Sequence, residues 1–101
     1  NNSIYAPNTV EKIQNIVALF FNLHIEDLKG KRRSKVIANA RMIAMYLCRT
    51  MTEETYPRIG LEFGGRDHST VIHAYEKISK DLKTNSELDK IIGELKKKIC
   101  E

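Results

Sequence analysis

The sequence lacks a long apolar run, because no window approaches the ~18 consecutive apolar residues that a membrane-spanning helix needs. Its polar opening, Asn1-Asn2-Ser3, does not resemble a signal peptide. Cysteine is scarce, and Cys48 and Cys100 have no metal-ligand partner at a useful spacing, so both are expected to stay reduced. These absences argue against export, a membrane contact and a metal centre. A cytoplasmic protein is expected.

The sequence also lacks any stretch that alternates between apolar and polar residues long enough to predict a β-strand. The chain has 101 residues, of which 42% are hydrophobic and 30% charged, as in one soluble globular domain. Residues 1–8, closed by Pro7-Asn8, resemble a linker, and residues 9–101 are expected to form the domain. The predicted fold class is all-α, a compact helical bundle.

Apolar residues recur every three to four positions in several segments, which is the period of an amphipathic helix. The expected helices are residues 10–22 after an Asn8 or Thr9 cap, a turn at 24–28 ended by Gly30, a long helix from a Ser34 cap to about residue 50, a short helix at 55–63, a helix at 67–83 and a last one from Ser86. Ile59, Leu61 and Phe63 are expected to supply the apolar contacts of the short helix.

The short helix and the helix at 67–83 are separated only by Gly64-Gly65-Arg66. This arrangement is typical of a helix-turn-helix, whose second helix lies in the DNA major groove with its first turn against the bases. Apolar residues predict the inward side of the second helix: Val71, Tyr75, Ile78 and Leu82. Polar and basic residues suited to a phosphate-lined groove lie on the other side: Arg66, Ser69, Thr70, His73, Lys77 and Lys80.

Positive charge is concentrated in one stretch. The formal net charge is +4, yet residues 29–41 hold six basic residues and no acid, whereas the remainder has 11 basic and 13 acidic residues. Such a run often forms only a solvated face. Its position between two apolar segments, without interspersed acids, instead favours an anion-binding loop that precedes the helix-turn-helix.

Several residues that could suggest a metal or catalytic site either have an ordinary structural role or lack the spacing that such a site needs. Asp67 is a good N-cap, with the N–H of Thr70 as its expected donor. His68 and His73 are five residues apart, which does not fit a two-histidine metal site on one helix. Side chains at 67–69 diverge by about 100° per residue, so they cannot form a catalytic relay. Since no phosphate-cradling loop is present either, the chain is not expected to be an enzyme or to bind nucleotide.

Residues 64–74, Gly-Gly-Arg-Asp-His-Ser-Thr-Val-Ile-His-Ala, closely resemble the signature of the C-terminal DNA-binding domain of the bacterial DnaA replication initiators. Lys31-Arg32-Arg33-Ser34 is similar to the basic loop of that family. The resemblance runs from about Thr9 to the C-terminus. It implies a helical bundle that binds double-stranded DNA at the DnaA box, a short asymmetric element repeated at the replication origin. The family's ATP-binding module is missing here, so ATP is expected only in that module.

The resemblance also implies roles for individual residues. Arg33 would enter the minor groove, and the residues that would read base edges in the major groove are Asp67, His68, Ser69 and Thr70. The residues that would hold or adjoin the phosphate backbone are Arg32, Ser34, Lys35, Arg41, Tyr56, Pro57 and Arg66, with Lys77 added from the helix face. Two positions depart from the family pattern: Ser69 replaces the usual threonine, and Met42 replaces a common glutamine.

The predicted function is therefore sequence-specific DNA binding at origin DnaA boxes, by a domain that is monomeric when isolated. Phosphate contacts would supply most of the affinity, and base contacts the specificity. The alternative is a helical protein-interaction module that binds a replication regulator, which would show little salt-dependent affinity for DNA.

Overall fold

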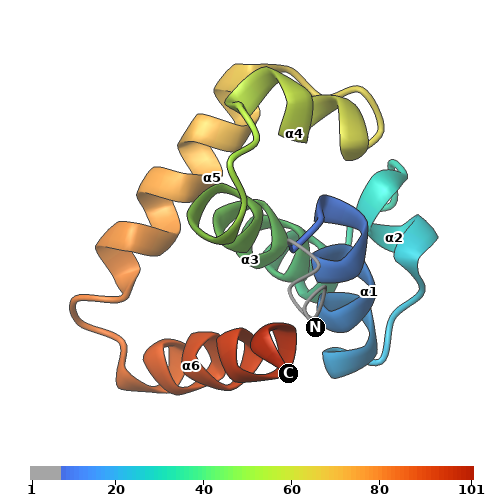
Figure 1. The fold of residues 1–101 in the computed structure, drawn as a ribbon. Helices are drawn as coiled ribbons and strands as arrows, with labels where there is room; N and C mark the ends of the chain where they lie inside the picture. The colour runs from blue at the N-terminus through green and yellow to red at the C-terminus, as the bar shows by residue number, and fades with distance from the viewer. Residues whose placement is uncertain (1–7) are drawn as a thin grey trace, which may run out of the picture.

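The computed structural model describes residues 8–101, and these contain six helices and no strand (Figure 1). The helices are α1 (Val10–Phe20), α2 (Ile25–Lys29), α3 (Lys35–Met51), α4 (Tyr56–Glu62), α5 (His68–Asp81) and α6 (Ser86–Cys100). The all-α fold class is confirmed. Apart from Asn8, the expected linker lies outside the described residues.

Helix α3 forms the centre of the bundle, with α1, α2, α4 and α5 packed against it, while α6 crosses one end and packs on α1 (Figure 1). The apolar stripe of α3 is buried at Ile37, Ala40, Ile43, Ala44 and Leu47 and half-buried at Met51, and Met45, Tyr46 and Cys48 are buried as well. These residues are buried because helices cover α3 on more than one side. Both cysteines are free, and burial raises the pKa of the Cys48 thiol, which makes it a weak nucleophile.

The helix starts follow the expected capping chemistry. Thr9, Ser34 and Thr55 are N-caps, and each hydroxyl accepts the backbone N–H three residues on at 3.1 to 3.3 Å. For α6 the cap is Asn85, one residue before the expected start at Ser86. Each cap satisfies an N–H that the helix itself leaves free, worth about 1 kcal/mol.

One apolar expectation is wrong. Ile59 and Phe63 are fully buried, but Leu61 is 64% exposed. Residues four apart share a helix face, whereas Leu61 lies two positions from each and therefore faces solvent. The buried position beside Ile59 is Gly60, where a Cβ would overlap the carbonyl oxygen of Arg66.

The turn between α4 and α5 depends on glycine. Gly64 and Gly65 have φ angles of 78° and 77°, the left-handed region that favours glycine. The N–H of Arg66 donates to the carbonyl of Gly60 at 2.9 Å and closes the turn. A Cβ at Gly64 would overlap the carbonyl oxygen of Lys29, so this turn lies directly against the end of α2.

Candidate nucleic-acid interface

Helix α5 is divided into an inner and an outer face, as the sequence predicts. Val71, Ala74 and Ile78 are buried, and Tyr75 and Leu82 are half-buried beside them. The exposed residues of the outer face are Ser69, Thr70, His73, Lys77 and Lys80. The Lys77 ammonium donates to the Asp81 carboxylate at 3.1 Å. Exposed ion pairs contribute little to stability, so exchanging the carboxylate for another anion costs Lys77 little.

Asp67 caps α5 differently from the expected way. Its Oδ2 accepts the N–H of Ser69 at 3.2 Å and also the Ser69 hydroxyl, whereas the Thr70 N–H donates to the Asp67 backbone carbonyl. These two bonds from Ser69 lower the pKa of the exposed Asp67 carboxyl. Oδ1 lies 3.5 Å from Nδ1 of His68. The carboxylate is therefore charged at neutral pH and held in one orientation by Ser69.

Residues 30–34, here called the basic loop, join α2 to α3. Lys31, Arg32 and Arg33 are all exposed, as is Lys35 at the start of α3. Arg32 is 77% exposed, and its Nη1 lies 3.4 Å from Oδ1 of Asp27. The cations expected to meet DNA from this loop therefore project into solvent.

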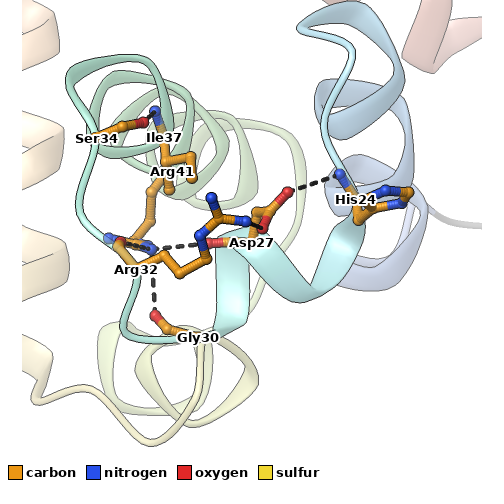
Figure 2. Close-up of polar contacts among 7 residues, drawn as sticks. All are labelled: His24, Asp27, Gly30, Arg32, Ser34, Ile37 and Arg41. Carbon is orange, nitrogen blue, oxygen red and sulfur yellow. Dashed lines mark hydrogen bonds and ion pairs between the residues drawn. The ribbon is translucent and has the colours of Figure 1, made fainter.

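Arg41 lies beneath the loop. It projects from α3 and is only 9% exposed (Figure 2). Its Nε donates to the carbonyl of Leu28 at 2.9 Å, and its Nη2 to that of Asp27 at 2.8 Å. Nη2 also reaches the carbonyls of Gly30 and Arg32, each at 3.2 Å. These donors were expected to face phosphate; the structure directs them to the protein's own backbone, and a direct phosphate contact stays a prediction.

Arg66 approaches the loop from the other side. This half-buried side chain donates from Nη1 to the carbonyls of Phe63 at 2.6 Å and Lys29 at 3.3 Å, and from Nη2 to Gly30 at 2.6 Å. The turn before α5 is thus bonded to the start of the basic loop. Here too the guanidinium binds backbone carbonyls, and contact with phosphate stays a prediction.

The basic loop and the two arginines enclose a shallow cavity of about 560 Å³, lined by Lys31, Arg33, Ser34, Ala38, Arg41 and Arg66. No acidic side chain lines it. The pKa of Arg41 is lowered mainly by burial and further by the positive charges of Arg66 and Arg33. The pKa of Arg66 is lowered by burial and by the positive charge of Arg33. Arginine stays protonated nonetheless, so the cavity presents concentrated positive charge suited to a phosphate group.

Tyr56 and Pro57 form the first turn of α4. Tyr56 is half-buried, with the Arg49 guanidinium 4.7 Å from its ring centroid, and Pro57 is exposed. Ser34 uses its hydroxyl oxygen to cap α3, which leaves its hydroxyl hydrogen free to donate.

Two features of this site were not predicted from the sequence. The buried Asp27 carboxylate accepts the N–H of His24 at 3.0 Å and pairs with Arg32, so it orders α2 and the loop together. The second feature is the set of backbone carbonyls that the two arginines bind. A carboxylate three residues after a possible N-cap was a usable signal for Asp27, but carbonyl groups leave no trace in a sequence.

Within residues 8–101, no group of histidine, cysteine and carboxylate side chains could hold a metal ion. None of the helices in this range is long and apolar enough to cross a membrane.

A short helix, a Gly-Gly turn and a longer helix with a polar outer face define a helix-turn-helix protein, here with a basic loop beside the second helix. Residues 10–78 match the family model described as the bacterial dnaA protein helix-turn-helix. The chain belongs to this family, whose members are DNA-binding domains of proteins that initiate replication. The match covers α1 to α4, the basic loop and most of α5, and it ends before α6.

Proposed function

We propose that this domain binds double-stranded DNA at the DnaA boxes of a replication origin and reads both grooves. The observation that carries the proposal is the bond of 2.6 Å from Arg66 to the carbonyl of Gly30. It joins the basic loop to the residue that precedes Asp67, so a loop suited to a minor groove and a helix end suited to a major groove form one surface.

In the major groove, the first turn of α5 would present Asp67, His68, Ser69 and Thr70, all of which are exposed. A carboxylate can accept a hydrogen bond from the exocyclic amine of cytosine, and hydroxyls can pair with several base edges. In the minor groove, Arg33 would be attracted by the negative potential of a narrow A·T-rich segment.

Phosphate contacts would supply most of the affinity, because neutralised phosphates release counterions. The exposed cations that could neutralise phosphates are Arg32, Lys35 and Lys77. Ser34 and Pro57 are exposed and Tyr56 is half-exposed, so these neutral residues could lie beside the phosphate backbone. The half-buried Arg66 and the buried Arg41 contribute positive charge to the cavity behind the loop.

The test is a competition at fixed salt between a duplex that carries one DnaA box and a scrambled duplex of the same length. We expect the box to be preferred at least about tenfold, which corresponds to about 1.4 kcal/mol. Equal affinities would reject sequence-specific binding. Weak binding to both, with little dependence on salt, would instead favour a protein-interaction module.

A further inference from the structure

We propose that Arg41 and Arg66 together form an arginine clamp that fixes the basic loop relative to the start of α5, and that this clamp determines the sequence preference. The two side chains are positioning residues that act through the loop. The inference rests on the proposed function, since sequence preference has meaning only if the domain selects a site in DNA.

The two arginines meet at one atom. The carbonyl oxygen of Gly30 accepts from Nη2 of Arg66 at 2.6 Å and from Nη2 of Arg41 at 3.2 Å. Arg41 comes from the central helix and Arg66 from the turn before α5, so this carbonyl links three elements. Figure 2 shows the Arg41 side of this arrangement, with its guanidinium against the loop backbone.

The clamp also completes the C-terminal end of α2, whose last carbonyls have no partner within the helix. The carbonyl of Glu26 accepts the Gly30 N–H, Arg41 takes those of Asp27 and Leu28, and Arg66 takes that of Lys29. Positive charge at this end is favoured by the helix dipole. The loop therefore leaves α2 in a defined direction.

Lysine cannot replace either arginine in this geometry. Arg41 binds four carbonyls and Arg66 three, with donors spread over a planar fork. A lysine ammonium carries the same charge but is a single point with three donors. Charge and positioning can thus be separated by one conservative substitution.

The close approach at Gly64 adds a second constraint. Because a Cβ there would overlap the Lys29 carbonyl oxygen, the α4–α5 turn lies directly against the last residue of α2, immediately before the loop. Arg33 in the loop and Asp67 beside Arg66 are consequently held at a set separation before DNA arrives. A preorganised surface loses less conformational freedom on binding. Its affinity is lower for DNA in which the two contacted positions do not fit this separation.

The experiment measures the affinity of the wild type, Arg41→Lys and Arg66→Lys for box and scrambled duplexes over a series of salt concentrations. We expect each lysine variant to lose about tenfold in box preference, which corresponds to about 1.4 kcal/mol and to the loss of one good base contact. The salt slope on scrambled DNA should stay at the wild-type value, because the charge is retained.

Two variants serve as controls. Lys35→Ala removes an exposed cation beside the loop and should lower the salt slope by about 0.9 without changing the preference. Lys90→Ala, on the exposed side of α6, should change neither quantity. Thermal unfolding checks that every variant is folded, and if Arg41→Lys is not, the half-buried Arg66→Lys carries the test.

A double-mutant cycle with Arg33→Ala shows whether Arg41 acts through the loop. Once Arg33 is gone, adding Arg41→Lys should cost less than about twofold further in box preference, because interacting residues are not additive. Full, independent losses in the double variant would overturn the clamp. So would lysine variants that keep the wild-type preference. A wild type without box preference would instead overturn the proposed function.

Discussion

At the scale of single residues, Asp67 caps α5 and, under the proposed function, would also contact a base. A carboxylate facing DNA is repelled by the phosphates, so it is worth keeping only if it gains something specific. In this structure Oδ2 is bonded to Ser69, whereas Oδ1 lies 3.5 Å from Nδ1 of His68. Oδ1 is therefore the atom available to accept from a cytosine amine.

Replacing Asp67 by asparagine separates capping from base contact. Asparagine caps helices about as well as aspartate, so the unfolding temperature should change little. Non-specific affinity should rise as repulsion falls, while the preference for the box should drop by about 1–3 kcal/mol at one base pair. The measurement is binding to a panel of single-base box variants. A uniform change across the panel would leave only the cap.

Ser69→Thr restores the methyl group that is usual in the family at this position. The hydroxyl that bonds to Asp67 is kept, and the added methyl can pack against a thymine methyl. Box affinity should rise by at most about 1 kcal/mol, the value of one methylene-sized contact. Titrations with thymine-to-uracil box duplexes identify the partner, since the gain should vanish at the contacted base. A gain that persists with every uracil would contradict a methyl contact.

At the scale of elements, the α4–α5 turn shows why two neighbouring positions both require glycine. Both of its glycines have positive φ, but only Gly64 lies against another backbone; a Cβ at Gly65 would meet nothing within 4 Å. The same residue type at adjacent positions therefore has two physical explanations. At position 65 glycine is required because the φ angle is positive. At position 64 it is required both for the positive φ angle and because the backbone lies close to the end of α2.

Gly64→Ala and Gly65→Ala form a matched pair. Each should lose about 1–2 kcal/mol of unfolding free energy from the left-handed backbone. Gly64→Ala should lose about 1–3 kcal/mol more, because its methyl must displace the Lys29 carbonyl. Urea unfolding measures both. Equal losses would show that the turn does not pack tightly against the end of α2.

At the scale of the whole molecule, the net charge of +4 understates the field that DNA would meet. The excess is confined to residues 29–41, where Arg41 is buried and the other cations are exposed in the basic loop and at the two helix ends beside it. Association should therefore be steered to one side of the bundle.

The salt dependence of box binding measures this field. If roughly six to eight phosphates are neutralised, log K against log salt should have a slope of about −5 to −7. A slope shallower than about −2 would mean that the basic loop does not anchor the complex.

Nucleotide should have no effect on this domain. Gly30-Lys31 resembles part of a phosphate-binding loop, but such loops hold phosphate with backbone N–H groups, and the Gly30 N–H donates to the carbonyl of Glu26 at 2.8 Å. Isothermal titration with ATP and magnesium should show no binding, and saturable binding at micromolar ATP would contradict this.

The sequence by itself determined the helices, most of their caps, the helix-turn-helix and the family. These depend on local chemistry: the N-caps Thr9, Ser34 and Thr55 act within four residues, and apolar periodicity acts within one helix. The exposed cations of the basic loop and the polar face of α5 could be predicted for the same reason. The exposure of Leu61 could also have been anticipated from its spacing.

Only the tertiary structure decided which cations face solvent and which hold the protein together. In the sequence, Arg41 and Arg66 look like further members of a basic surface. Their partners are backbone carbonyls. Because every residue has one, the sequence does not show which carbonyls an arginine will bind. Arg66 and Gly30 are 36 residues apart, so their meeting depends on how the α4–α5 turn packs against α2. That packing, which requires the absence of a side chain at Gly64, brings Arg66 to the backbone of the loop that Arg41 also binds.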